Sequence, residues 1–181
     1  MPRSYAPASP TVRAAVRGAL AALLSLALLA HARPLDAQGE GQGDPNHSSV
    51  TVSRLGDLVF GLVVGGASVV VRPDDPAAAH FEVRVRGGPS HVVTLTIALP
   101  AALLSGPDRL PVRFDANSAA WATSDAPDAR TAFDPARGTT VTLDQRGPKS
   151  LLVWIGGTLE PMQAQPSGDY SALIALSAVE N

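Results

Sequence analysis

The side chains that could do chemistry are few and lie scattered along the chain. His47, His80 and His91 are far apart, and no two of them have the spacing of zinc ligands on one element. Cysteine is absent, which excludes disulfides, zinc–thiolate sites and a thiol nucleophile. Imidazoles at the ends of strands or in turns are the simpler interpretation of these histidines.

Carboxylates occur in segments rich in turn-forming residues. Asp74 and Asp75 form one turn signal, and Asp125, Asp128 and Asp134 lie in a stretch rich in Ala, Ser and Pro. Loop carboxylates can bind calcium, but none of these segments has the spaced D-x-D-x-D-G pattern. We therefore assign the acids to turns, and we expect no metal and no other cofactor.

Motifs of the common enzyme classes are missing from the sequence. There is no G-x-S-x-G elbow for a serine hydrolase, no P-loop and no G-x-G-x-x-G fingerprint. Glycosidases need two facing carboxylates, usually between aromatic walls, and the whole chain has only two Trp, two Tyr and four Phe. The sequence therefore predicts a protein that is not an enzyme.

Four aromatic residues are the remaining candidates for a binding or structural role. Trp121 lies in an irregular stretch and is the candidate ligand contact, whereas Trp154 lies in an apolar strand and is expected in the core. Phe81 belongs to an alternating strand and is expected to be structural. Tyr170 begins a late strand, where a buried ring with its hydroxyl bonded to nearby backbone is favoured over an exposed ligand-stacking role.

The N-terminal segment has the features of a secretory signal. Arginines precede an uncharged run from Ala19 to Ala30, and small residues follow it. Twelve residues span about 18 Å as a helix, less than the ~30 Å of a bilayer core. We predict that residues 1–37 are a signal peptide helix, cleaved after Ala32 or Ala37, and that no membrane span remains afterwards.

The charge of the remaining chain limits its partners. Cleavage after Ala37 would remove four of 14 Lys and Arg and one of 16 Asp and Glu, which leaves 10 and 15 and a formal charge of −5. A mildly acidic chain offers no basic surface for phosphates, so nucleic acid is not an expected partner. The expected location is the periplasm, the cell surface or the medium, without a lipid anchor, because acylation needs a cysteine.

Alternating apolar residues predict an all-β domain. Residues 38–49 are polar and glycine-rich and are expected to be a flexible leader, and residues 50–181 form the domain. Phe81 to Arg86 and Val93 to Leu99 have the two-residue period of half-buried strands. Further apolar or alternating runs end at residues 155 and 179, and about seven or eight short strands with frequent turns predict a β-sandwich.

The stretch from Asp115 to Gly138 is the exception, because it has no clear periodicity. A structureless loop of that length is uncommon in a compact domain. We expect a helical turn or an irregular strand around Trp121.

Several short segments, taken in order, resemble a known family. They include Leu58-Val59-Phe60-Gly61, His80 to Gly87, Val93 to Pro100, Ile155 to Leu159 and Ser167 to Ser171. Together they are similar to a bacterial family of secreted domains of unknown function and, more distantly, to spore coat protein U and chaperone–usher pilin subunits. This resemblance implies an immunoglobulin-like, pilin-like β-sandwich and implies no catalytic residues.

Two functions follow as expectations. The first is an exported structural or assembly protein, pilin-like or coat-like, whose partners are copies of itself or other envelope proteins joined by strand addition. The leader argues against polymerisation through its own N-terminus, because it lacks apolar alternation. The alternative is a monomeric secreted module that binds a carbohydrate, a peptide or an envelope component through the loop around Trp121.

Overall fold

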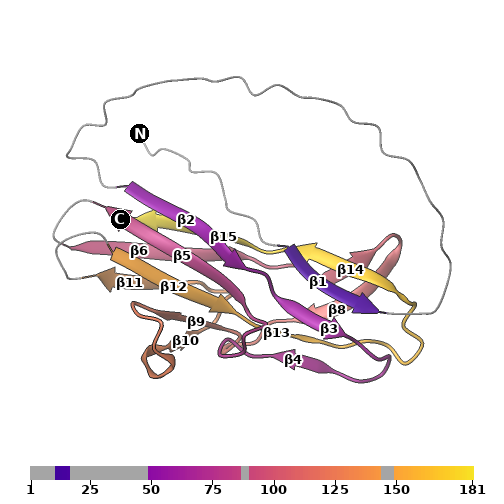
Figure 1. Ribbon diagram of the computed structural model, residues 1–181. Coiled ribbons are helices and arrows are strands. Elements are labelled where there is room, and N and C mark those ends of the chain that lie inside the picture. Colours follow the sequence, from indigo (N-terminus) through magenta and orange to yellow (C-terminus); the bar gives the residue numbers. More distant parts are fainter. Residues whose placement is uncertain (1–10, 17–48, 87–89, 144–148) are drawn as a thin grey trace, which may run out of the picture.

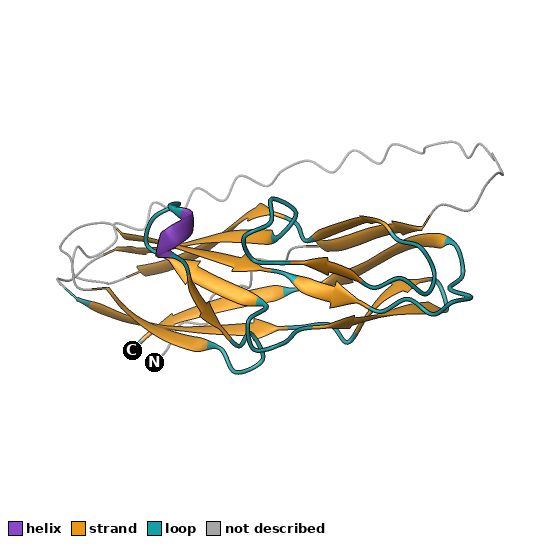
Figure 2. Ribbon diagram, turned by 90° about the horizontal axis from the view of Figure 1, so that it is seen from below, coloured by secondary structure: helices purple, strands orange, loops and turns teal. Residues whose placement is uncertain are grey.

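The computed structural model describes residues 11–16, 49–86, 90–143 and 149–181. Figure 1 shows an elongated, all-β molecule in which strands run roughly along the long axis. The strands are β1 (Thr11–Val16), β2 (Ser49–Gly56), β3 (Val59–Leu62), β4 (Val69–Val71), β5 (Ala79–Arg86), β6 (His91–Ala98), β7 (Ala102–Ser105), β8 (Asp108–Arg113), β9 (Ala119–Ala122), β10 (Thr131–Phe133), β11 (Thr139–Leu143), β12 (Lys149–Ile155), β13 (Gly157–Leu159), β14 (Gly168–Leu173) and β15 (Ala175–Glu180). One 3₁₀ turn, η1 (Pro127–Ala129), is the helical segment of the described chain (Figure 2).

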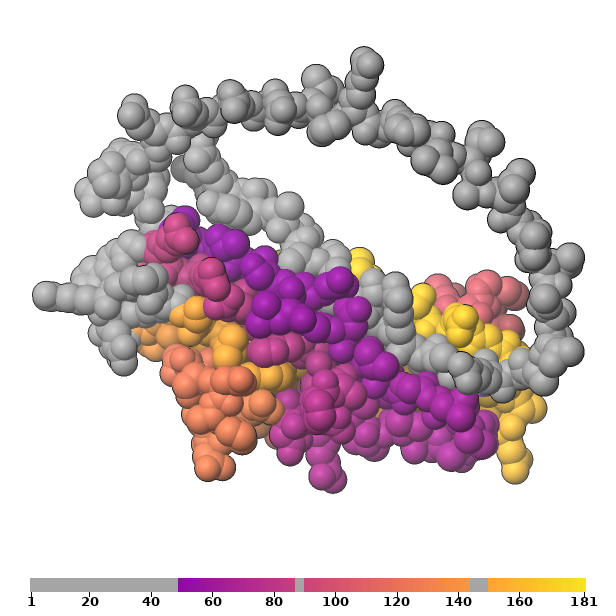
Figure 3. Space-filling view, in the orientation of Figure 1, coloured from indigo at the N-terminus to yellow at the C-terminus, as the bar shows by residue number. Residues whose placement is uncertain are grey.

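The strands form three sheets that enclose one core. The largest has the order β3-β1-β14-β7-β8-β13-β4, the second has the order β10-β9-β12-β5-β2, and the third consists of β11-β6-β15. Neighbouring strands are antiparallel except β1 and β3, which are parallel. The segment from β2 to β4, purple in Figure 3, runs along one face of the molecule. The fold is therefore an all-β sandwich, as the sequence predicted, but the described residues form 15 strands instead of the expected seven or eight.

The core follows directly from the alternation along the strands. In β5 the side chains of Phe81, Val83 and Val85 are fully buried, and those of the intervening residues are partly or fully exposed. In β6, Val93 and Leu95 are buried in the same way. A half-buried sheet requires this period, because successive side chains of a strand point to opposite faces.

At two places the chain passes directly from a strand of one sheet to a strand of another. β14 ends at Leu173 and β15 begins at Ala175, so only the fully buried Ile174 separates a strand of the first sheet from a strand of the third. β2 and β3 are related in the same way, with Asp57 and Leu58 between them. Each connection contributes one fully buried residue to the core, Ile174 in the first and Leu58 in the second.

The stretch from residue 115 to residue 138 is ordered rather than a long loop. It contains β9, the turn η1 and β10, and β9 pairs with both β10 and β12. Of the two alternatives expected around Trp121, the strand is the one found there, as β9, and the 3₁₀ turn follows at Pro127–Ala129.

Only part of the N-terminal segment is described. Within the predicted signal, residues Thr11–Val16 form β1, and the apolar run from Ala19 to Ala30, expected to be helical, lies outside the described residues. The leader at residues 38–48 also lies outside them, and Ser49 is the first residue of β2. No helix in the described part of the chain is long and apolar enough to cross a membrane.

Candidate functional site

The most informative feature of the fold is the position of β1 between β3 and β14 (Figure 1). β1 pairs antiparallel with β14 over its whole length, from Thr11 opposite Leu173 to Val16 opposite Gly168. On its other side it pairs in parallel with β3. We call the place that β1 fills the β3–β14 slot. Within the described residues, β1 is the sole sheet neighbour of β3.

The interior side of the slot is apolar and well packed. Phe60 of β3 is almost completely buried, and Tyr170 of β14 is about 1% exposed. The Tyr170 hydroxyl donates a hydrogen bond to the Pro166 carbonyl at 2.8 Å and accepts one from Gln165 Nε2 at 2.9 Å. Gln165 Nε2 also donates to the Arg109 carbonyl at 3.0 Å, so Tyr170 is fixed to the turn before β14 and to β8.

The outer side of the slot carries exposed apolar side chains. Val59 and Leu62 on β3 are 43% and 64% exposed, and Leu104 on β7 and Leu173 on β14 are 47% and 53% exposed. β7 is the neighbour of β14 on the side away from β1, with Leu104 paired to Ser171. Exposed apolar residues therefore lie on both sides of β1.

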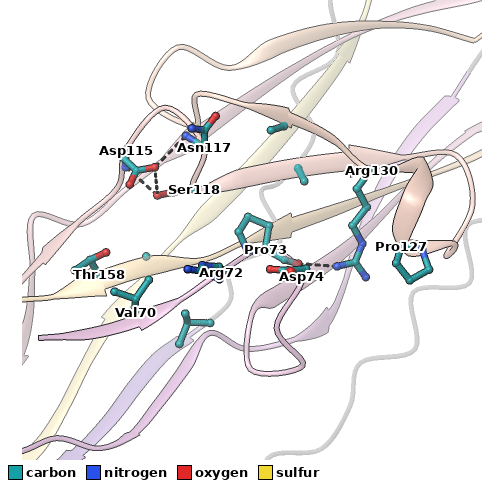
Figure 4. Close-up of a pocket in the computed structure, with 14 residues that line it drawn as sticks. Val70, Arg72, Pro73, Asp74, Asp115, Asn117, Ser118, Pro127, Arg130 and Thr158 are labelled. Atoms are coloured by element: carbon teal, nitrogen blue, oxygen red, sulfur yellow. Dashed lines mark hydrogen bonds between the residues drawn. The ribbon is translucent and has the colours of Figure 1, made fainter.

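A second candidate is a pocket of about 380 Å³ on the side of the molecule shown in Figure 4. It is lined by the end of β4, the start of β9, β13 and the region of η1 and β10. The pocket contains both charge signs, with Arg72 and Arg130 opposed by Asp74 and Asp115.

Arg130 is the best-positioned charged group of this pocket. Its Nη1 donates a hydrogen bond to the Pro73 carbonyl at 2.9 Å (Figure 4), and its guanidinium carbon lies 4.0 Å from the centre of the Trp154 ring. His80 stacks on the same indole at 4.8 Å. Arg130 Nε and His80 Nε2 are buried, and neither has a hydrogen-bond partner in the described part of the chain.

The protonation of His80 follows from these surroundings. Burial is the main cause that lowers the pKa of His80 below its usual value, and the positive charge of Arg130 acts in the same direction. The carboxylates of Asp125 and Glu82 oppose this shift. The neutral imidazole is therefore favoured beside Trp154.

Two of the carboxylates predicted to lie in turns, Asp75 and Asp134, bind backbone amides, and so does Asp115. Asp115 Oδ1 accepts hydrogen bonds from the Asn117 amide at 2.9 Å and the Ser118 hydroxyl at 3.0 Å (Figure 4). Asp75 accepts from the Ala77 amide at 2.8 Å, and Asp134 binds the amide two residues on in the same way. Among the described residues, no group of three or more His, Asp or Glu side chains could hold a metal ion.

The four aromatic candidates lie in different places. Trp121 lies in β9, opposite Thr131 and Val153, where it is half-buried and packs against the core. It is not among the residues that line the Arg130 pocket. Trp154 and Phe81 are buried, and Tyr170 belongs to the β3–β14 slot.

Sequence reasoning missed the two features that matter most. Arg130 is one of two arginines in an aperiodic stretch, and no pattern in the sequence distinguishes it. β1 did have a signal, because Val12, Ala14 and Val16 alternate with Thr11, Arg13 and Ala15. The arginines around it and the apolar run after it favoured the interpretation as a signal peptide.

Fold and site together define a class of protein: an all-β sandwich in which the N-terminal strand β1 lies between β3 and β14. The chain belongs to a family described as "Domain of unknown function (DUF4402)", whose model matches residues 42–179. The match begins after β1 and covers every other strand to within one residue of the end of β15. No curated protein and no solved structure matches the chain.

Proposed function

We propose that this chain is an exported, non-enzymatic structural or assembly protein of the bacterial periplasm or cell surface. In this role its domain accepts a strand from a partner in the β3–β14 slot. The resemblance of the sequence motifs to pilin-like and coat-like domains supports such a role. The hydrogen bonds that Asp75, Asp115 and Asp134 accept from amides two residues on also fit it, because these acids stabilise turns.

One observation carries the proposal: the strand that fills the slot belongs to the segment predicted to be removed on export. Cleavage after Ala32 or Ala37 would take away β1 and leave the facing backbone groups of β3 and β14 without partners. Unpaired backbone groups beside a core are costly, and an open strand edge is a template for another strand. A partner strand would restore both ladders.

The experiment uses residues 38–181 and a synthetic peptide of residues 9–18, which contains β1. We expect the peptide to bind and to raise the melting temperature of residues 38–181, because a ligand specific for the folded state stabilises it. Fluorescence anisotropy of the labelled peptide measures binding, and calorimetry measures the melting temperature. A peptide that leaves the melting temperature unchanged at saturating concentration contradicts the proposal.

Two peptide variants provide a matched control. Ala14 lies opposite the buried Tyr170, whereas Ala15 lies opposite the exposed Asp169. Ala14→Lys introduces a charge opposite the buried Tyr170, where an unpaired charge is costly, and Ala15→Lys introduces one opposite the exposed Asp169. Ala14→Lys should abolish binding, and Ala15→Lys should retain it.

The Arg130 pocket favours a second function, a monomeric secreted module that binds a carbohydrate, a peptide or an envelope component. The Arg130 guanidinium contacts the Trp154 ring and the Pro73 carbonyl beside an open pocket. An array of glycans and peptides probed with residues 38–181 and with its Arg130→Gln variant tests this function. Arg130→Gln is a cleaner test than Trp121→Ala, because Trp121 packs against the core.

A further inference from the structure

We infer that the Arg130 pocket binds an acidic sugar, a hydroxyl-rich ring that carries a single carboxylate. This inference rests on the second function proposed above, the secreted binding module, and names the ligand class of its site. The residues that line the pocket lie between Val70 and Thr158, inside the segment that matches the family. Cleavage near the N-terminus would therefore remove none of them.

Two arginines of the pocket have no carboxylate partner in the described part of the chain. They are Arg72 and Arg130, although Asp74 and Asp115 line the same pocket. Other arginines of the domain have a carboxylate partner at 2.9–3.4 Å: Arg54, Arg84, Arg113 and Arg137. A guanidinium binds a carboxylate through two parallel N–H···O hydrogen bonds, so Arg72 and Arg130 offer a site for such an anion.

The Arg130 side chain is held in place and still has a donor to offer. Its Nη1 donates to the Pro73 carbonyl, and its guanidinium lies against the Trp154 ring. Nη2 donates to no acceptor among the described residues, and unlike Nε it is not completely buried. A ligand can therefore accept from Nη2 without moving the side chain, which lowers the entropy lost on binding.

The acids of the pocket limit the charge of the ligand. Arg72 and Arg130 are balanced by Asp74 and Asp115, so these four side chains together are formally neutral. A phosphate dianion would be attracted by the arginines and repelled by both acids. One carboxylate beside the arginines leaves the hydroxyl groups of the same sugar free to donate to the acids, because carboxylate oxygens are hydrogen-bond acceptors.

The neutral polar groups of the pocket also suit a sugar. The Asn117 and Thr158 side chains line it and have no hydrogen-bond partner among the described residues. Both can donate to and accept from hydroxyl groups. No aromatic side chain is found among the described residues that line the pocket, since Arg130 covers Trp154. Charge and hydrogen bonds, and not ring stacking, would therefore hold the ligand.

The pocket is built from turns that carry their own hydrogen bonds. Figure 4 shows the turn from Asp115 to Ser118 and the Arg130 side chain at opposite sides of the view, with Arg72 and Asp74 between them. The Arg72 carbonyl accepts from the Asp75 amide at 3.0 Å. The volume of about 380 Å³ lies within the range of small-molecule sites, about 300–1,000 Å³.

The experiment titrates the full chain with oligomers of galacturonic, glucuronic and mannuronic acid in a calorimeter. Methyl esters of the same oligomers are the matched ligand control, because the ester removes the charge and keeps the sugar. We expect at least one acid oligomer to bind, and its ester to bind about tenfold more weakly or not at all.

Three arginine variants locate the binding. Arg72→Gln and Arg130→Gln should each weaken binding of the acid oligomer by about tenfold. Arg109→Gln removes an exposed charge outside the pocket and should leave binding unchanged. Arg72 is exposed, so Arg72→Gln remains a test of the site if Arg130→Gln destabilises the fold.

The other outcomes separate the inference from the function on which it rests. Esters that bind as tightly as the acids overturn the inference, and so does an equal loss of binding in Arg109→Gln and Arg72→Gln. A glycan and peptide array on which the full chain binds neutral glycans, sulfated glycans or peptides, but no uronic acid oligomer, overturns the inference and leaves the binding module standing. A full chain that binds nothing on that array overturns both.

Discussion

Tyr170 connects the β3–β14 slot to the turn that precedes β14. Its ring is part of the core, and its hydroxyl takes part in two hydrogen bonds, with Pro166 and Gln165. Tyr170→Phe keeps the ring and removes both bonds. We expect the free energy of unfolding to fall by about 1–2 kcal/mol, as measured by urea denaturation. A denaturation midpoint equal to that of the wild type would show that these hydrogen bonds contribute nothing.

His80 predicts a pH dependence of stability. Its pKa is lowered in the folded protein, mainly by burial, so the unfolded chain binds the proton more readily. The stabilisation from neutral His80 is complete above the unfolded value of about 6.5 and is lost as the pH falls towards the folded pKa. His80→Phe, which keeps an aromatic ring beside Trp154, should flatten the melting temperature between pH 7.5 and pH 5.

The contributions of His80 and Glu82 to the pH dependence of stability fall in different pH ranges. The hydrogen bond from Arg84, followed by that from Ser150, lowers the pKa of Glu82. The contribution of Glu82 to stability therefore changes only at pH values below the usual pKa of a glutamate. An equally steep loss of stability in the wild type and in His80→Phe above pH 5 would refute the role of His80.

At the scale of the element, Gly138 sets the approach of β11 to β6. It has φ of +71°, and a Cβ added there would lie 2.3 Å from the Leu95 carbonyl oxygen of β6. Gly106, between β7 and β8, has φ of +58° and open space around it. Gly106→Ala should cost about 1 kcal/mol for the backbone conformation alone, and Gly138→Ala clearly more. Thermal unfolding of both variants compares them, and equal costs would contradict the close approach.

The strands also differ in how well the sequence predicts them. β5, β6 and β11 alternate regularly, and Tyr170 to Ala178 keep one face towards the core although Ile174 separates β14 from β15. β7, β9, β10 and β13 have only three or four residues, which is too short for a period to appear. Their positions are determined by neighbouring strands, which a local pattern does not contain.

At the scale of the whole molecule, β1 joins the edge strand β3 to the rest of the first sheet. Without it, β3 would have no sheet neighbour among the described strands. Hydrogen exchange of the full chain and of residues 38–181 tests this arrangement. We expect the amides of β3 and β14 that face β1 to exchange faster in residues 38–181, while β5 and β12 remain protected. Equal protection of β3 in both proteins would mean that β1 does not hold it.

The candidate site could be predicted less well than the fold, because it is made by contacts between distant parts of the chain. Pairing of residues 11–16 with residues 168–173 is not visible in any local pattern. The same holds for Arg130, which directly follows η1 and contacts Pro73 and Trp154, both distant in the sequence. The export interpretation and the β1 pairing are drawn from the same N-terminal residues, and the proposed function joins them.

The pairing of β1 along both of its sides has a mechanical consequence. Its ladders with β14 and β3 run parallel to the long axis of the molecule (Figure 1). Tension along this axis would load these hydrogen bonds in shear, so that many must break together, whereas a sideways pull would break them one after another. A partner strand held in the same place would therefore resist stretching far better than peeling, and the lifetime of the joint under load would depend on the rate of unfolding.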